Sequence, residues 1–132
     1  MGGLKRKMHR VMLKSKIHRA VVTDADVNYE GSVAIDESLM EAAGIYPFEQ
    51  VQIYDITNGE RITTYAIKAE RGGGTVTING AAARLVRKGD IVIIASYSMY
   101  TEEEACRHNP VLIYVDERNA VKKAMGEALG SV

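Results

Sequence analysis

Two alternating runs of residues separated by an Asn-Gly pair constrain the fold of this chain most strongly. Residues 50–56 (QVQIYDI) alternate polar and apolar side chains, which is the pattern of a half-buried strand. Asn58-Gly59 follows them and favours a tight turn between antiparallel strands. Residues 61–67 (RITTYAI) then return with successive side chains on opposite faces. This stretch predicts a β-hairpin.

Other short β-rich runs, separated by turns, occur along the rest of the chain. We expect strands at residues 11–22, 33–35, 75–78, 91–97 and 111–115. The sequence shows no internal repeat and no second domain, and the three glycines at 72–74 indicate a flexible break. Many short strands with frequent turns are typical of a compact barrel or sandwich.

Short helices are expected at three places. Asp36 can cap a helix over residues 37–43, which Gly44 would end. Asn79-Gly80 looks like a turn that leads into a second short helix, and Thr101 opens a third with a capping-box sequence. The tail from Lys122 is rich in glycine and small residues, so we expect it to fray.

Length and composition exclude several classes of protein. A chain of 132 residues with 46% apolar and 26% charged residues is a single globular domain, not a disordered or membrane-embedded one. Its longest apolar run, 91–95, falls far short of the roughly 20 residues of a membrane-spanning helix. The basic start, 1–7, is not followed by the apolar region of a secretory signal. A lone Cys106 cannot form an internal disulfide, so we expect a cytoplasmic protein.

The charges balance overall but are unevenly distributed. With 17 basic and 17 acidic residues, nothing global favours nucleic acid. Basic side chains nevertheless crowd the first twenty residues: Lys5, Arg6, Lys7, His9, Arg10, Lys14, Lys16, His18 and Arg19. Two interpretations stay open, a solvated arm with an exposed strand face, or cations that hold an acidic substrate.

Gly31-Ser32 is an ordinary turn sequence that carries a second possibility. In a strained turn the serine hydroxyl can attack the preceding carbonyl and convert the amide into an ester. β-Elimination then breaks the ester and leaves a dehydroalanine, which hydrolyses to a pyruvoyl group with loss of ammonia. The chain would thereby make an electrophilic ketone at a new N-terminus.

Nine segments, in order, resemble the pyruvoyl-dependent aspartate 1-decarboxylases. Each is weak evidence alone, but together with the cleavable Gly-Ser bond they are specific, and the likeness runs from about residue 12 to 115. The segments are Met12–Ala20, Thr23–Asp26, Tyr29–Ser32, Ile35-Asp36, Thr57–Arg61, Thr64-Tyr65, Glu70–Gly72, Asn79–Arg84 and Gly89–Ile94.

The resemblance implies a mainly β fold, a double-psi β-barrel with a few short helices, which assembles as a homotetramer with active sites between neighbouring subunits. The barrel would span residues 12–117, between a basic extension at 1–11 and a tail at 118–132. Self-cleavage between Gly31 and Ser32 would give chains 1–31 and 32–132, the second headed by pyruvoyl. The implied reaction converts L-aspartate to β-alanine and carbon dioxide through an imine, on the route to pantothenate and coenzyme A.

The chemistry agrees with the residues present. Decarboxylation needs an electron sink, and a pyruvoyl ketone derived from Ser32 supplies the one that pyridoxal phosphate supplies elsewhere. We see no phosphate-cradling motif, and His9, His18 and His108 are too scattered in sequence to suggest a metal site. We therefore expect pyruvoyl as the cofactor, with no metal and no pyridoxal phosphate.

The two carboxylates of aspartate call for cationic or amide-rich partners. In the family pattern Lys16 and Arg61 line the substrate pocket; Arg61 can bind a carboxylate through two parallel hydrogen bonds, whereas Lys16 acts as a point charge. Which cation binds which carboxylate stays open. The pattern also marks Asn79, Gly80, Ala81 and Ala82 as substrate-binding, and main-chain N–H groups at such a turn can bind an anion.

Tyr65 is the proton donor that the family pattern offers, because a phenol is protonated at neutral pH. The pattern gives Thr64 a role in both cleavage and substrate binding. Thr64 points the opposite way along an ideal strand, so a bulge or the strand end must let both residues serve one site. His18, Tyr29 and Tyr54 flank the site by the same analogy, and Tyr54 stands where some relatives carry tryptophan.

Two alternatives to the decarboxylase stay open at this point. One is a non-catalytic β-barrel module whose basic N-terminal strand binds an acidic partner or nucleic acid. The other keeps the fold but makes the chain an unprocessed paralogue, because cleavage depends on backbone strain that residues only imply. A maturation factor is a further possible partner, and neither a membrane nor nucleic acid is expected as one.

Overall fold

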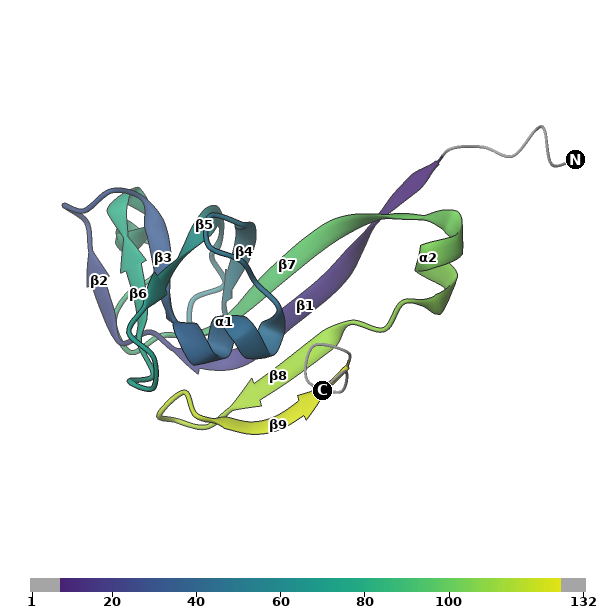
Figure 1. Cartoon of the computed structure of the whole chain (residues 1–132). Coiled ribbons are helices and arrows are strands. Elements are labelled where there is room, and N and C mark those ends of the chain that lie inside the picture. The colour runs from purple at the N-terminus through teal and green to yellow at the C-terminus, as the bar shows by residue number, and fades with distance from the viewer. Residues whose placement is uncertain (1–7, 127–132) are drawn as a thin grey trace, which may run out of the picture.

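Short strands dominate the computed structural model, which describes residues 8–126 (Figure 1). The chain forms β1 (His9–Val21), β2 (Asp24–Asp26), β3 (Ser32–Asp36), α1 (Glu37–Ala43), β4 (Gln50–Asp55), β5 (Arg61–Ala69), β6 (Val76–Asn79), the 3-10 helix η2 (Gly80–Arg84), β7 (Ile91–Thr101), α2 (Glu102–Arg107), β8 (Val111–Val115) and β9 (Val121–Met125). The prediction of a mainly β domain with a few short helices is confirmed.

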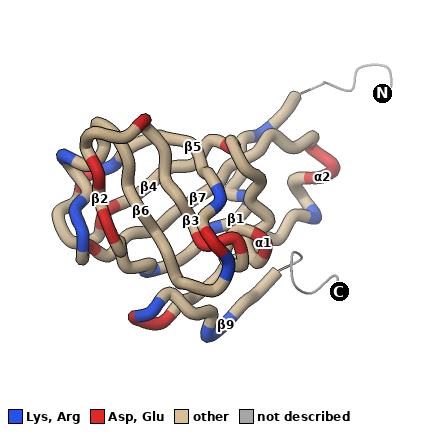
Figure 2. The backbone as a smooth tube through the Cα atoms, turned by 60° about the vertical axis from the view of Figure 1, so that its left-hand side comes forward, with Lys and Arg blue, Asp and Glu red and all other residues tan. Residues whose placement is uncertain are grey.

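All nine strands belong to one sheet, in the order β2-β6-β3-β5-β4-β7-β1-β8-β9. Three pairings, β1 with β8, β2 with β6 and β3 with β5, are parallel, and the others are antiparallel. Helix α1 contacts β1, β3 and β8, although β3 and β8 are far apart in the sheet order. The sheet must therefore curl round, as the tube in Figure 2 shows, which agrees with the predicted barrel.

The inner face of this curled sheet carries the hydrophobic core. In β4, Val51 and Ile53 are buried, whereas the alternate residues Gln50, Gln52 and Tyr54 are more exposed. The predicted hairpin is confirmed, since β4 pairs antiparallel with β5 through the turn that contains Asn58-Gly59. The largest fully buried side chains come from many strands and from α1: Ile17, Ile35, Leu39, Met40, Ile53, Ile78, Ile94 and Ile113.

The predicted helix over residues 37–43 and both of its end signals are confirmed. Asp36 accepts a hydrogen bond from the Ser38 N–H at 2.8 Å, and Gly44 ends the helix with a φ of 69°. Asp36 also accepts hydrogen bonds from the N–H groups of Gly72 and Gly74. Burial opposes ionisation of Asp36, but these hydrogen bonds hold its pKa below the usual value. The predicted break at 72–74 is confirmed as the turn between β5 and β6, and this buried carboxylate anchors two of its N–H groups.

β1 and β7 extend beyond the barrel as a two-stranded arm, with α2 at its tip (Figure 1). β7 continues past the predicted end at Tyr97 because residues from His9 onward pair with it. At the tip, Thr101 and Glu104 form the predicted capping box, and Arg10 pairs with Glu102 at 2.9 Å. The arm exposes apolar side chains, with Val11 68% and Met99 64% accessible.

Two strands lie where none was expected. β2 has three residues and polar ends, so it carries no alternation signal. The prediction that the tail frays from Lys122 is wrong for residues 122–125, which belong to β9; residues 127–132 lie outside the described part. β9 is mostly exposed and is held by backbone pairing with β8. The predicted domain limits stay a prediction.

Register shifts in β1 explain the mixed faces of residues 11–22. One shift lies between Leu13 and Ser15 and a second between Ile17 and Ala20. Arg19, inside the second shift, has a φ of 67°. Among residues 8–126, no helix is both long and apolar enough to cross a membrane.

Candidate active site

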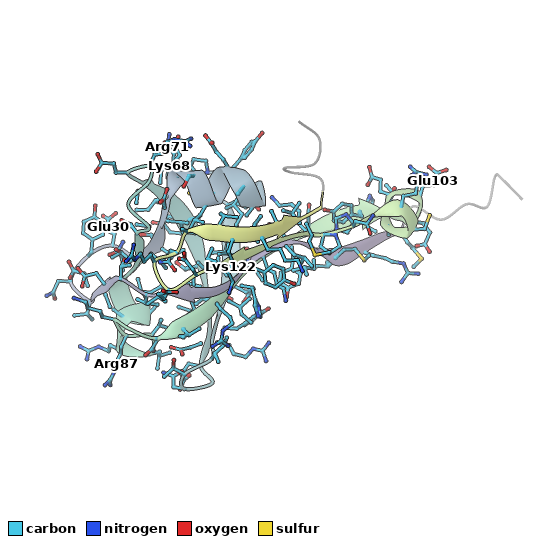
Figure 3. All side chains as sticks on the ribbon, turned by 90° about the horizontal axis from the view of Figure 1, so that it is seen from below. Glu30, Lys68, Arg71, Arg87, Glu103 and Lys122 are labelled. Carbon is cyan, nitrogen blue, oxygen red and sulfur yellow. The ribbon has the colours of Figure 1, made fainter. Side chains whose placement is uncertain are left out.

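Gly31-Ser32 lies where the β2–β3 turn enters the sheet. Figure 3 shows the neighbouring Glu30 at the end of the molecule opposite Glu103 in α2. Ser32 is only 2% exposed, although Gly31 before it is exposed. The Asn79 side-chain amide donates to Ser32 Oγ at 3.1 Å, and Ser32 Oγ donates to the Glu30 carbonyl at 3.4 Å. The serine hydroxyl is therefore held beside its own preceding peptide.

Gly80 brings the main chain of η2 against this segment. Its φ is 82°, and a Cβ built on it would lie 2.6 Å from Gly31 Cα and 2.8 Å from Gly31 N. The same atom would lie 3.2 Å from the carbonyl oxygen of Tyr29. Only glycine fits such a contact. The absence of a side chain at Gly80 and the amide of Asn79 make this place fit a pyruvoyl group derived from Ser32.

The predicted turn and short helix after Asn79 are confirmed, as η2. Gly80 is buried, Ala81 is exposed, and Ala82 packs partly against the core. The first N–H groups of such a helix have no partner within it, so they point to the space before Gly80.

Tyr65 lies level with Ser32 on the neighbouring strand. β3 and β5 pair in parallel with Val33 opposite Ala66, so one step back along both strands places Ser32 beside Tyr65. Ser32 pairs with Asn79 on its other side, and Tyr65 pairs with Gln50. Residues opposite one another share a face, so these four side chains form one row on the outer face of the sheet.

Thr64 points to the inner face, since β5 keeps a continuous register with both neighbours. The bulge considered for Thr64-Tyr65 is therefore not present. The role of Thr64 in cleavage, with the strand end as the feature that would bring it to Gly31-Ser32, stays a prediction.

Arg61 and Tyr54 lie on the outer face at the other end of the hairpin. They pair across β4 and β5, and the Arg61 guanidinium carbon lies 4.4 Å from the centre of the Tyr54 ring. The Tyr54 and Tyr97 hydroxyls are 2.8 Å apart. This hydrogen bond and burial raise the pKa of Tyr97. No sequence signal pointed to Tyr97, because its partner depends on the register between β4 and β7.

Lys16 lies on β1, four inter-strand spacings from Ser32 on β3. The strands β5, β4 and β7 lie between them in the sheet order. Lys16 pairs with Ala95, which on its other side pairs with Gln52. One chain therefore holds two groups of residues, which we call the cleavage cluster (Gly31, Ser32, Tyr65, Asn79, Gly80) and the cation cluster (Lys16, Tyr54, Arg61, Tyr97).

Two of the remaining basic residues near the N-terminus, Lys14 and Arg10, form ion pairs within the fold. Lys14 Nζ contacts Glu49 Oε2 at 2.6 Å and the Gly44 carbonyl at 2.7 Å. Arg10 is paired with Glu102. Lys5, Arg6 and Lys7 lie outside the described residues. Lys14 and Arg10 thus serve structural ion pairs.

His18 and Tyr29 lie at the edges of this arrangement. The His18 ring packs edge-on against Tyr114 at 5.3 Å, in a groove of about 270 Å³ between β1 and β8. Burial, followed by the charges of Lys16 and Arg19, lowers the pKa of His18. Tyr29 is exposed in the turn before Gly31. The structure thus places Tyr29, but not His18, beside the cleavage segment of the same chain.

The described part of the chain contains no group of three or more His, Cys, Asp or Glu residues that could hold a metal ion. That no metal takes part in the reaction stays a prediction.

Comparison with known proteins identifies the family. The family model for aspartate decarboxylase matches residues 8–122. The aspartate 1-decarboxylase of Syntrophus aciditrophicus is 60% identical over 87% of this chain and 99% of its own. That of Thermoanaerobacter pseudethanolicus is 59% identical over 85% of this chain and 96% of its own. That of Stenotrophomonas maltophilia is 56% identical over 86% of this chain and 90% of its own.

Among solved structures, the computationally designed msDPBB_sym2 protein aligns with a TM-score of 0.40 and 21% identity, over 66% of this chain and 96% of its own. The similarity to the sequenced relatives is far stronger and extends through both clusters. The chain belongs to the aspartate decarboxylase family.

Proposed function

We propose that this protein is a self-processing enzyme that decarboxylates L-aspartate to β-alanine and carbon dioxide, for pantothenate and coenzyme A synthesis. The observation that carries the proposal is the buried Ser32 hydroxyl, which Asn79 holds beside the Gly31-Ser32 peptide in a chain of this family. The relatives named above are aspartate 1-decarboxylases, which supports the same substrate here.

Processing starts at Ser32. Its Oγ attacks the Gly31 carbonyl carbon, the C–N bond breaks, and Gly31 is then joined to Ser32 as an ester with a free amine. Loss of the Ser32 α-proton expels the Gly31 carboxylate and leaves a dehydroalanine, and water converts this to the pyruvoyl ketone and ammonia. Asn79 holds the attacking oxygen, and Thr64 would hydrogen bond the Gly31 carbonyl, as the family pattern implies.

Once formed, the pyruvoyl group supplies a ketone that accepts the electrons released when carbon dioxide leaves. The protein residues bind the substrate and manage its charges and protons. Arg61 and Lys16 bind its carboxylates, and the Tyr54 ring holds the Arg61 guanidinium in place. Main-chain N–H groups at Gly80–Ala82 add a further anion contact. The Tyr65 hydroxyl gives its proton to the substrate carbon after decarboxylation.

The separation of the two clusters supports a homotetramer with shared active sites. Because β5, β4 and β7 lie between Lys16 and Ser32 in the sheet order of one chain, we infer that the cation cluster of one subunit completes the cleavage cluster of another. A groove of about 370 Å³ beside Tyr54 and Tyr97 continues onto the exposed apolar side chains of the arm, Val11 and Met99, which a neighbouring copy would cover.

Intact-mass spectrometry tests the processing step. The wild-type protein should give two fragments divided after Gly31, the second with the mass of a pyruvoyl terminus, and should release β-alanine and carbon dioxide from L-aspartate. Ser32→Ala should stay one inactive chain, whereas Glu103→Ala, a change at an exposed residue of α2, should be processed normally. A wild-type chain that consumes aspartate with Ser32 unmodified would overturn the proposal, and an unprocessed, inactive one would identify a paralogue or the need for a maturation factor.

Subunit complementation tests the shared site. Ser32→Ala keeps the cation cluster but cannot form the pyruvoyl group, and Arg61→Ala does the reverse. Each should be inactive alone, and co-expression should restore part of the activity in mixed oligomers. No restored activity in mixed tetramers of confirmed composition would show that each site uses residues of one chain only. The cytoplasmic location stays a prediction.

A further inference from the structure

Phe48 combines two features that are unfavourable for an ordinary surface residue. It lies in the turn between α1 and β4 with a φ of 72°, a left-handed conformation that bulky side chains rarely adopt. Its side chain is also 76% exposed, so burial does not offset the strain. Strained residues that persist in a fold are often found at functional sites.

The turn that holds Phe48 is anchored on both sides. The Phe48 N–H donates to the Ala66 carbonyl at 2.6 Å, and the Ala66 N–H donates to the Glu49 carbonyl at 3.0 Å. Glu49 is fixed by Lys14 at 2.6 Å, by the Ser96 hydroxyl and by the Tyr46 N–H at 2.9 Å. The surrounding structure therefore imposes the conformation of Phe48.

The consequence of this conformation is a contact with Tyr65. The Phe48 and Tyr65 ring centres are 6.5 Å apart with an angle of 33° between their planes. This separation lies within the range in which aromatic rings attract one another. Tyr65 itself is 37% exposed on the outer face of the sheet, level with Ser32.

We propose that Phe48 is a positioning residue for the phenol of Tyr65. The proposal rests on the function proposed above, in which the Tyr65 hydroxyl gives its proton to the substrate carbon that has lost carbon dioxide. Proton donors must be held within hydrogen-bond reach of the receiving atom. The Phe48 ring restricts the side chain of Tyr65 on this open face, and takes no part in the transfer of the proton.

Three variants separate the effect of the Phe48 ring from the effect of the strained backbone at this position. Phe48→Asn removes the ring but keeps a residue that tolerates the left-handed conformation. Phe48→Tyr keeps an aromatic ring and should behave as the wild type. Tyr46→Asn is the matched control, because Tyr46 lies in the same turn and is also 76% exposed.

The first measurement does not depend on activity. The full Ser32→Ala chain is labelled with 3-fluorotyrosine, and the Tyr65 signal is assigned by its absence from a Tyr65→Phe version. Phe48→Asn should shift the Tyr65 fluorine signal through loss of the Phe48 ring current, and Tyr46→Asn should leave it in place. An unchanged Tyr65 signal in Phe48→Asn would overturn the proposal.

The second measurement uses processed enzyme. Phe48→Asn should lower kcat about 3- to 10-fold with little change in KM, the size expected when one aromatic contact to a catalytic group is lost. Phe48→Tyr should retain wild-type kcat. In a Tyr65→Phe background, Phe48→Asn should cause no further loss, because the residue that it positions is no longer a donor.

The outcomes distinguish this inference from the proposed function. Equal losses in both backgrounds, or dissociation of the oligomer by Phe48→Asn alone, would show that Phe48 serves folding or subunit contact and would overturn the inference. A Tyr65→Phe enzyme with full kcat would overturn the donor role of Tyr65, and the inference with it. If Tyr65→Phe lowers kcat as expected but Phe48→Asn leaves kcat unchanged, the inference about Phe48 is overturned and the proposed function is not.

Discussion

The main chain of Gly80 lies against Gly31, so close that a single added Cβ would be 2.6 Å from the Gly31 α-carbon. The start of η2 and the peptide at which we propose cleavage are therefore one packed unit. In this chain the same segment contributes the glycine contact and, through Asn79, the hydrogen bond to the Ser32 hydroxyl.

Gly80→Ala should slow self-cleavage by about 10-fold or more, because the new methyl group must displace Gly31 from its place beside Ser32 Oγ. Gly59→Ala is the matched control: Gly59 has the same φ of 82°, but a Cβ there would meet nothing within 4 Å. The fraction of cut chain is followed by intact-mass spectrometry. Equal cleavage rates in the two variants would show that the Gly80 contact is unimportant.

Asn79→Ala should also slow cleavage, by about 5- to 10-fold, since the buried Ser32 hydroxyl loses the donor that orients it. Asn28→Ala, in the exposed turn before the cleavage site, serves as the control. The same mass measurement applies. A variant at Asn79 that matures as fast as the control would remove this residue from the processing step.

Tyr54→Leu should raise the KM for L-aspartate about 2- to 5-fold, because the Arg61 guanidinium loses the ring over which it lies. Tyr54→Phe keeps the ring and loses only the hydrogen bond to Tyr97, so its KM should change less. Steady-state kinetics of the processed proteins distinguish the two. An equal rise in both would assign the effect to the hydroxyl pair instead.

Asp55 makes stability depend on pH. Burial, the hydrogen bond to the Asp90 carboxyl group and the charge of Asp90 raise the pKa of Asp55 to about 6. The folded state then binds the proton more tightly than the unfolded state, whose pKa is near 3.8. Stability from this group is therefore complete below the unfolded pKa and is lost as the pH rises through about 6.

Asp55→Asn should remove this loss, since its amide keeps an acceptor for the N–H groups of Thr57 and Asn58 and cannot ionise. Measured in the uncut Ser32→Ala chain, Tm should rise by about 3 °C at pH 8 and much less at about pH 4, close to the unfolded pKa. Glu117→Gln, at an exposed position for which no hydrogen bond or ion pair is seen within residues 8–126, is the control for a general charge effect. A Tm gain that is the same at both pH values would contradict the explanation.

Local signals in the sequence predicted several elements well. The cap at Asp36, the stop at Gly44 and the turn at Asn58-Gly59 act on neighbouring residues, and each of them is where the sequence placed it. The residue pattern of the family likewise led to Ser32, Asn79 and Gly80, which the structure brings together.

Features that depend on pairing between distant strands could not be read from the sequence. The Tyr54–Tyr97 hydrogen bond requires the register of β4 against β7, and the fixed glycines at 72–74 require a carboxylate 36 residues away in sequence. The contact between Phe48 and Tyr65 depends on a backbone angle that no propensity favours for phenylalanine. Lys16 was expected to line the substrate pocket, and only the strand order shows that β5, β4 and β7 separate it from Ser32 in the sheet of one chain.

β1 lies between β7 and β8 in the sheet, and scission after residue 31 would leave it joined to the rest by non-covalent contacts alone. Folding of a subunit would then change from a unimolecular reaction into a bimolecular one. The precursor could refold from denaturant at any dilution, whereas the mature enzyme would recover at a rate that rises with protein concentration. After self-cleavage, the denatured enzyme would therefore recover its assembled state only slowly at low protein concentration.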